Sequence, residues 1–280
     1  MPVMVSVLIT GCSSGFGELA ARSFAAAGHD VIATMRTPSR GEDLLADAAA
    51  AGWSLRVVAL DVTDQASIHA AKTEVGVPDV LVNNAGVELV APVTGASDEE
   101  MLWQFEANVF GVARMLRTFV PDMRDRGAGV VVNVGSIAGL VGRPFAGFYA
   151  ATKHALEGLS EALRFEVGRR GVRVHLIQPG QFPTALGGNT RHAEAFAPGS
   201  EDWELNERLS IAIKGLVPES TSGGADAQTV ADVIVRVALD PEAPFRTLVG
   251  GDAEMIAAVK AQGTFEDFEQ TMRTTLDFWE

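Results

Sequence analysis

The sequence predicts a single-domain α/β protein built on a doubly wound parallel sheet of about seven strands, with helices on both faces. Short apolar segments alternate with longer segments of helical periodicity along most of the 280 residues. The short segments are apolar throughout rather than at every second position, as strands buried on both faces require. A β-α-β-α order of this kind implies parallel strands joined by right-handed crossovers.

The strands are expected where runs of Val, Leu, Ile and Ala are bounded by turn residues, because such side chains fill a buried pleated surface. The seven expected strands are Val5–Ile9, Val31–Met35, Leu55–Leu60, Val80–Val82, Val130–Val134, Val172–Ile177 and Thr247–Val249.

The helices are expected where apolar residues recur at helical spacing. They are Glu18–Ala27, Asp43–Ala51, Asp64–Glu74, Asp98–Arg126, Phe148–Arg169 and Ala227–Leu239. Gly28 and Gly52 stop the first two, since glycine is the usual residue just past a helix end. Pro121 is expected to bend or end the long fourth helix, because proline lacks an amide hydrogen and clashes with the preceding turn.

Two stretches fall outside this alternation within the single domain, residues 1–280. Thr184–Ala225 is rich in Gly, Ser, Pro and polar residues. It is either a disordered insertion or a mobile lid over a site, since long ordered loops in compact domains are usually functional. The tail, residues 251–280, carries Phe265, Phe268, Phe278 and Trp279 among acidic residues. It either packs on a neighbouring subunit or closes the pocket.

Composition excludes several classes of protein. The formal net charge of −14 argues against nucleic-acid binding, which relies on basic patches. No uncharged apolar stretch approaches the ~20 residues of a membrane span. Met1–Ser6 has no basic region, so no signal peptide is expected. With Cys12 as the only cysteine and no metal-ligand spacing among the histidines, we expect a cytoplasmic protein without disulfide or metal site.

A glycine-rich turn follows the first expected strand. It has the spacing G-x-x-x-G-x-G and comprises Thr10, Gly11, Cys12, Ser13, Ser14, Gly15, Phe16 and Gly17. Between a strand and a helix, such glycines let the backbone turn tightly and approach a pyrophosphate at the helix N-terminus, as in the Rossmann fold. We expect this turn to bind a dinucleotide, and Cys12 to be a small buried filler.

The end of the second strand bears on the choice of cofactor. Dinucleotide folds hold the ribose of NAD with an acid about 20 residues past the glycines, whereas Arg suits a 2′-phosphate. No carboxylate lies between Val31 and Gly41, and Arg36 ends the strand. This favours NADP(H), with a solvated surface Arg36 as the alternative. Asp61 and Val62 are expected at the adenine edge; for Asp61 the alternative is a helix N-cap region.

Tyr149 and Lys153 lie four residues apart, and therefore on one face of the fifth expected helix. A tyrosine of pKa near ~10 is a poor base at neutral pH, and a nearby cation favours its ionised form. We therefore expect Lys153 to lower the pKa of Tyr149 and allow proton exchange with a carbinol oxygen. Ser136, after the fifth strand, can donate a hydrogen bond to the same oxygen.

Taken together, the motifs resemble the classical short-chain dehydrogenase/reductase family, over roughly residues 3–250. The shared positions are Thr10–Gly17, Asn83, Asn84, Ala85, Gly86, Asn108, Ser136, Tyr149, Lys153, Pro179 and Gly180. The segments Thr34–Arg36 and Val249–Ala253 resemble a narrower branch, the 17β-hydroxysteroid-dehydrogenase-like members.

The resemblance implies a role for each residue. Tyr149 is the acid/base, Ser136 steadies the substrate oxygen and Lys153 holds the nicotinamide ribose. Asn108 anchors a water-mediated proton relay. The residues implied to line the cofactor cleft, or its nicotinamide end, are Asn84, Ala85, Gly86, Pro179, Gly180, Phe182 and Thr184. From the residues alone, Asn83 and Asn84 are equally turn caps, and Asn108 a side chain that satisfies backbone groups.

The substrate site is expected to be largely apolar, which suits bulky hydrophobic ketones, aldehydes or alcohols. Its walls are expected from Phe145, Phe148, Phe182, Leu186, Phe196 and Trp203, with Arg143, Arg191 and His192 as partners for a polar tail. The alternatives are core packing for each wall residue and, for Arg191 and His192, exposure to solvent, which the sequence favours. The expected function is NADP(H)-dependent carbonyl reduction or alcohol oxidation in a homodimer or homotetramer, the oligomer being implied by the resemblance. The alternative is a non-catalytic NADP-binding redox sensor or regulatory module.

Overall fold

The computed structural model describes residues 3–182, 189–215 and 226–276, so Thr184 and Leu186 lie outside the described residues. Its main sheet has the order β3-β2-β1-β4-β6-β7-β9, and all neighbouring strands are parallel. The strands are β1 (Ser6–Thr10), β2 (Asp30–Met35), β3 (Leu55–Ala59), β4 (Val80–Asn83), β6 (Gly129–Val134), β7 (Val172–Pro179) and β9 (Arg246–Val249). The predicted seven-stranded parallel sheet in a single domain is confirmed.

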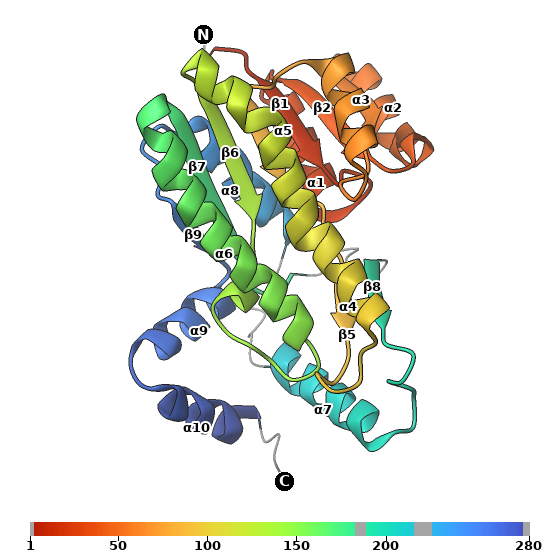
Figure 1. The fold of residues 1–280 in the computed structure, drawn as a ribbon, viewed down its shortest axis with the longest axis vertical. Coiled ribbons are helices and arrows are strands. Elements are labelled where there is room, and N and C mark those ends of the chain that lie inside the picture. Colours follow the sequence, from red (N-terminus) through yellow and green to blue (C-terminus); the bar gives the residue numbers. More distant parts are fainter. Residues whose placement is uncertain (1–2, 183–188, 216–225, 277–280) are drawn as a thin grey trace.

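Helices cover both faces of the sheet (Figure 1). They are α1 (Gly15–Ala26), α2 (Glu42–Ala51), α3 (Gln65–Val75), α4 (Asp98–Phe105), α5 (Gly111–Arg126), α6 (Gly147–Val167) and α8 (Ala227–Leu239). Val7 and Ile9 of β1 pack in one core with α1 and α8, whereas Leu8 packs in a second core with α3, α5 and α6. Both faces of the strand are therefore buried, which explains its unbroken apolar run.

The order of the strands creates a switch point beside β1. The chain builds outward from β1 to β3, and then returns to place β4 on the other side of β1. Crossovers on opposite faces leave a crevice at the carboxyl ends of β1 and β4, which is where open α/β sheets bind ligands.

The long helix expected over Asp98–Arg126 is interrupted. A π-helical turn, η2 (Glu106–Phe110), separates α4 from α5. Pro121 lies inside α5, which continues to Arg126, so of the two expected effects, a bend or an end, the structure excludes the end. Asn108 lies in this π turn, and its side chain forms hydrogen bonds to residues outside the helix.

Elements beyond the predicted set gather at one end of the molecule (Figure 1). They are the two-stranded parallel sheet of β5 (Glu88–Val90) and β8 (Thr190–His192), and the helices α7 (Glu201–Gly215), α9 (Gly251–Ala261) and α10 (Phe265–Leu276). A third apolar cluster joins Leu89, Phe196, Leu209 and Leu276. It contains residues of both stretches that the sequence left unassigned. None of the described helices is long and apolar enough to cross a membrane.

Candidate functional site

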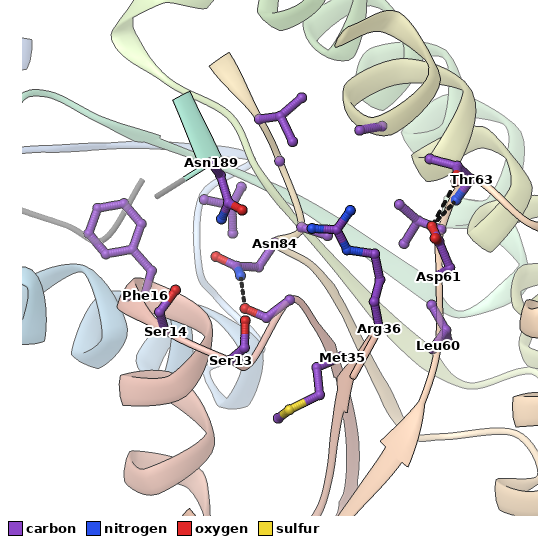
Figure 2. Close-up of a pocket in the computed structure, with 18 of the residues that line it drawn as sticks. Ser13, Ser14, Phe16, Met35, Arg36, Leu60, Asp61, Thr63, Asn84 and Asn189 are labelled. Carbon is purple, nitrogen blue, oxygen red and sulfur yellow. Dashed lines mark hydrogen bonds between the residues drawn. The ribbon is translucent and has the colours of Figure 1, made fainter. Parts of the chain in front are cut away.

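A cleft opens at the carboxyl ends of the central strands, with an empty volume of about 1080 Å³. Figure 2 shows Ser13, Ser14 and Phe16 on one side of it, Asp61 and Thr63 on the other, and Arg36 between them. The residues that line it are Gly11, Ser13, Ser14, Gly15, Phe16, Met35, Arg36, Leu60, Asp61, Val62, Thr63, Asn84, Ala85, Gly86, Val87, Ala107, Val134, Gly135, Tyr149, Lys153 and Asn189.

The glycine turn has the geometry that a dinucleotide requires. Gly11 and Gly15 have φ angles of +75° and +62°, which side chains rarely adopt. A Cβ at Gly17 would collide with the side chain of Asn84 and the carbonyl of Gly11. Ser14 precedes α1 without capping it through its side chain, so N–H groups of the first helical turn remain available. The turn therefore fits an anion such as a pyrophosphate.

Asn84 holds the glycine turn as well as lining the cleft. Its Nδ2 donates to the carbonyls of Thr10 (2.9 Å) and Gly11 (3.2 Å). The backbone N–H groups of Asn84 and Ala85 both donate to the Thr10 hydroxyl at 3.0 Å. Asn83 instead points into the sheet and donates to Asn133 at 2.9 Å. Asn84 thus both stabilises the glycine turn and lines the cleft. Asn83, in contrast, forms its hydrogen bond within the sheet.

A second hollow, with an empty volume of about 490 Å³, lies beside Arg36. It is lined by Ser13, Met35, Arg36, Thr37 and Arg40. The guanidinium groups of Arg36 and Arg40 make no hydrogen bond or ion pair within the described ranges. Two unpaired cations and two hydroxyls can bind a phosphate there. The sequence analysis did not single out Arg40, although it lies in the same carboxylate-free segment as Arg36.

Asp61 lines the cleft and also closes a local turn. Its Oδ1 accepts hydrogen bonds from the backbone N–H of Thr63 at 2.9 Å and from the Thr63 hydroxyl at 2.8 Å. The N-cap of α3 is Asp64, whose carboxylate accepts from Ala66 N–H. Asp61 is therefore not the helix cap. Val62 lies next to it in the cleft wall, against Gly111.

Tyr149, Lys153 and Ser136 meet at the inner end of the cleft. Ser136 follows β6, is 9% exposed, and lies close enough to Tyr149 to lower the pKa of the phenol. Lys153 is buried and donates to the Val134 carbonyl at 2.9 Å. Its Nζ lies 5.6 Å from the centre of the Tyr149 ring. The three side chains that the sequence proposed for proton transfer thus lie together.

Burial controls the protonation of this group. It raises the pKa of Tyr149 far above its ordinary value; Glu88 adds to the increase, whereas Ser136 and Arg143 oppose it. Burial also lowers the pKa of Lys153 to about 8, against the attraction of Glu88. The expectation that Lys153 would lower the pKa of Tyr149 therefore does not hold here. The cost of burying a phenolate outweighs the nearby cation, and the Lys153 ammonium is directed to a backbone carbonyl.

Asn108 is fully engaged by backbone and side-chain partners. Its Oδ1 accepts from Val87 N–H at 2.9 Å, and its Nδ2 donates to the Val87 carbonyl at 2.9 Å and to the Thr152 hydroxyl at 3.1 Å. These bonds attach the π turn both to the segment before β5 and to α6 next to Lys153. Asn108 thus satisfies buried backbone groups, and its relay role stays a prediction.

The segment after β7 is held by a buried carboxylate. Asp252, 7% exposed at the start of α9, accepts from Gln181 N–H at 2.6 Å. A Cβ at Gly180 would collide with this carboxylate. The Phe182 ring lies edge-on to Phe16 with centroids 5.9 Å apart. Pro179, Gly180 and Phe182, expected at the cofactor, are not among the residues that line the cleft.

Four of the six residues expected in the substrate wall lie in one apolar cluster, and their role in binding substrate stays a prediction. Phe145, Phe148, Phe196 and Trp203 share the third apolar cluster, whereas Phe182 packs on the core beneath α1. Arg143 pairs with Glu88. Arg191 lies over the Trp103 ring at 4.2 Å, and the exposed His192 stacks near Phe196 and Trp203.

Several residues that line the cleft went unnoticed in the sequence. Most of them are direct neighbours in sequence of residues that were expected in the cleft. Their position at the end of a strand was the signal that could have identified them. They are Met35, Leu60, Thr63, Val87, Ala107, Val134, Gly135 and Asn189. Among the described residues, no cluster of His, Cys, Asp and Glu has the arrangement of a metal site.

Comparison with known proteins agrees with this geometry. The family model described as short chain dehydrogenase matches residues 5–195. A 3-ketodihydrosphingosine reductase of Bacteroides thetaiotaomicron is 34% identical over 256 residues, which are 90% of this chain and 90% of that protein. The 17-beta-hydroxysteroid dehydrogenase type 1 of Homo sapiens is 42% identical over 188 residues, 64% of this chain and 57% of that protein.

Solved structures are similar over nearly the whole chain. A short-chain dehydrogenase from Streptomyces avermitilis is 34% identical with a TM-score of 0.79, over 98% of this chain and 99% of that one. A short chain dehydrogenase/reductase from Burkholderia phymatum in complex with NAD is 28% identical with a TM-score of 0.77, over 96% and 95%. The glycine turn, the cleft and these similarities together show that the chain belongs to the short chain dehydrogenase family of oxidoreductases.

Proposed function

We propose that the protein is an NADP(H)-dependent carbonyl reductase that interconverts bulky hydrophobic ketones or aldehydes and the corresponding alcohols. The observation that carries this proposal is the meeting of Tyr149, Lys153 and Ser136 at the inner end of a cleft that begins at the glycine turn. A dinucleotide along the cleft would reach from Arg36 to Tyr149.

The proton chemistry follows from the environment of each side chain. A bound nicotinamide supplies or accepts the hydride. The raised pKa of Tyr149 keeps its phenol protonated at neutral pH, so that it can protonate the carbonyl oxygen during reduction. Ser136 donates a hydrogen bond to the same oxygen. Lys153, with its pKa lowered to about 8, can return a proton to the phenolate.

The pocket beside Arg36 supports NADP(H) over NAD(H). Arg36 and Arg40 bring two cations to the end of β2, and Ser13 and Thr37 add hydroxyl donors. No carboxylate in this hollow would accept bonds from a ribose 2′-hydroxyl. A 2′-phosphate therefore has better partners here than a free ribose.

The third apolar cluster supports a bulky substrate. Phe145, Phe148 and Trp203 pack in one cluster with Leu89 and Val90 of β5. Such a wall favours carbon-rich molecules. The two relatives named above are likewise named for large, carbon-rich ketones and alcohols.

The first test is the decay of nicotinamide absorbance with small, aryl and polycyclic ketones, using NADPH and NADH in parallel. Turnover with NADPH is expected. In Tyr149→Phe, kcat should fall by at least about 10³-fold, because the proton donor is lost. Cofactor binding, followed by NADPH fluorescence, should remain unchanged. Full activity of the variant would refute the mechanism, and no decay across the panel would favour the non-catalytic NADP-binding module.

A second test concerns the 2′-phosphate. Arg36→Asp should lower the ratio of kcat/KM with NADPH to that with NADH by about 10²-fold, since it replaces a phosphate partner with a carboxylate. Arg56, exposed on the neighbouring strand β3, provides the matched charge change. Arg56→Asp should leave the ratio within about twofold. Equal effects of the two substitutions would remove Arg36 from the cofactor site.

A further inference from the structure

We propose that Arg143, held by Glu88 beside Tyr149, binds a second oxygen acceptor on the substrate. The preferred substrates are then keto-acyl compounds, which carry a carboxylate or an acyl carbonyl in addition to the ketone on a hydrophobic chain. This inference rests on the carbonyl reductase function proposed above and narrows its substrate class.

The segment that carries Arg143 has a fixed shape. It links η3 (Ile137–Gly139) to α6 and ends just before Tyr149. Phe145 has a φ of +61°, the one positive value at a non-glycine residue in the described ranges. The Phe145 carbonyl accepts from Ala91 N–H at 2.9 Å, and its ring stacks on Phe196 at 5.5 Å. Backbone strain of this kind persists where the surroundings impose it, and it clusters at functional sites.

Glu88 reaches this segment from β5, whose neighbouring residues border the cleft. It follows Val87 and pairs in register with Thr190, the neighbour of Asn189; Val87 and Asn189 both line the cleft. Glu88 Oε1 lies 2.7 Å from Arg143 Nη2. The Glu88 side chain is 13% exposed and that of Arg143 is 35% exposed. The ion pair thus spans the end of β5 and the segment before Tyr149.

Stability alone gives a weak reason for charges at this position. A half-buried ion pair loses most of its Coulomb energy to desolvation. The surrounding residues of the third apolar cluster, including Leu89 and Phe145, cannot hydrogen-bond either charge through their side chains. Both charges also act on the reaction centre, since Glu88 raises the pKa of Tyr149 and Arg143 lowers it. A charged pair whose electrostatic effect reaches the reacting group is suited to recognising a polar part of the substrate.

The free hydrogen-bonding capacity lies on Arg143. A guanidinium carries five N–H donors and no acceptor. In the part of the chain that the structure describes, only Nη2 of Arg143 has a protein partner. The carboxylate of Glu88 already accepts from Arg143 and, at 3.5 Å, from the Thr190 hydroxyl. The substrate group must therefore be an acceptor, and a carboxylate or acyl carbonyl matches the planar fork of arginine.

The test compares kcat/KM, with NADPH, for three substrates of one carbon skeleton: a keto acid, its methyl ester and the plain ketone. The wild type should prefer the acid or the ester at least about tenfold, because a site built to hydrogen-bond rejects an analogue without the partner. Arg143→Met should remove that preference, because the side chain no longer offers the acid or the ester a hydrogen-bond donor. Arg143→Lys should retain part of it for the acid. Arg191→Met, which removes a second arginine from the substrate side, should leave the preference intact.

A binding measurement separates this inference from the proposed function. The saturated fatty acid of the same length has the acceptor but no ketone, so its dissociation constant in the presence of NADPH does not depend on turnover. It should rise at least about tenfold in Arg143→Met, with circular dichroism confirming that the variant folds. Equal binding by wild type and variant overturns the inference. A preference for an amino ketone that is lost in Glu88→Gln also overturns the inference. It would mean that Glu88 binds a cationic group of the substrate. Absence of turnover alone counts against the proposed function.

Discussion

Tyr149 and Lys153 lie one helical turn apart on α6, and burial moves their pKa values in opposite directions. For the phenol it disfavours the anion, and for the ammonium it disfavours the cation. Burial therefore shifts each group towards its neutral form relative to the unfolded chain. This is an arrangement for passing a proton rather than for a permanent charge pair, and the spacing of the two residues in sequence does not show it.

The pH dependence of the free energy of unfolding should reflect the burial of Lys153. Between its lowered pKa of about 8 and its ordinary 10.5, the unfolded chain binds a proton that the folded protein releases. The free energy of unfolding therefore rises with pH in this range. Above pH 10 the raised pKa of Tyr149 acts in the opposite direction, since the folded phenol keeps a proton that the unfolded chain loses. The informative window is thus pH 8 to about 10.

Over that window, the wild type should gain about 2 kcal/mol relative to Lys153→Met, measured by urea unfolding at each pH. The variant removes only the titrating group and keeps an unbranched side chain of similar length. Parallel pH profiles of the two proteins would mean that the Lys153 ammonium is not buried in solution.

At the scale of the secondary-structure elements, the turn between β9 and α9 holds the segment that follows β7. Asp252 on this turn bonds to the backbone at Gln181 and forces position 180 to be glycine. The turn therefore fixes the strand end that follows β7. The family resemblance assigns this strand end to the nicotinamide. Asp252 is therefore expected to position the strand end for cofactor binding.

Asp252→Ala would remove the carboxylate that accepts from the Gln181 N–H, at a cost of about 1–3 kcal/mol. We expect KM for NADPH to rise about fivefold or more, with a smaller change in kcat, because the strand end that the family resemblance assigns to the nicotinamide loses its anchor. Asp226→Ala is the control, since this carboxylate caps α8 by accepting from Gln228 N–H at 2.9 Å. It should lower stability by about 1 kcal/mol without changing KM. A lower stability of Asp252→Ala with an unchanged KM would limit Asp252 to a structural role.

For the whole molecule, exposed apolar side chains point to self-association. Phe165 on α6 is 84% exposed, Leu102 on α4 57%, and Phe110 in the π turn 43%. The helices α4, α5 and α6 lie together on one side of the molecule (Figure 1). Exposed apolar side chains on the helices of one side favour a protein interface there, and homo-oligomers reuse such a face symmetrically.

Light scattering should therefore give a mass at least twice the 29.5 kDa of the monomer. Phe165→Glu should shift the mass towards the monomer, because it places a charge in the interface. Ile211, 72% exposed on α7, supplies the control. Ile211→Glu should leave the mass unchanged. A monomeric wild type at micromolar concentration would refute the expected homodimer or homotetramer.

The sequence by itself determined the strands of the sheet, their parallel direction and the three side chains at the inner end of the cleft. Those features depend on local signals: unbroken apolar strands, glycines between strand and helix, and the i, i+4 spacing of Tyr149 and Lys153. Each is set within a few residues, so one chain is enough to recognise it.

Only the tertiary structure decided the rest. The π turn at Asn108 depends on bonds to Val87, and the pairing of Glu88 with Arg143 joins residues 55 positions apart. The β5–β8 sheet and the packing of α10 on α7 likewise bring distant segments together. Such contacts follow from how the folded elements meet. The direction of the pKa shift at Tyr149 follows for the same reason, because it depends on burial by the whole fold.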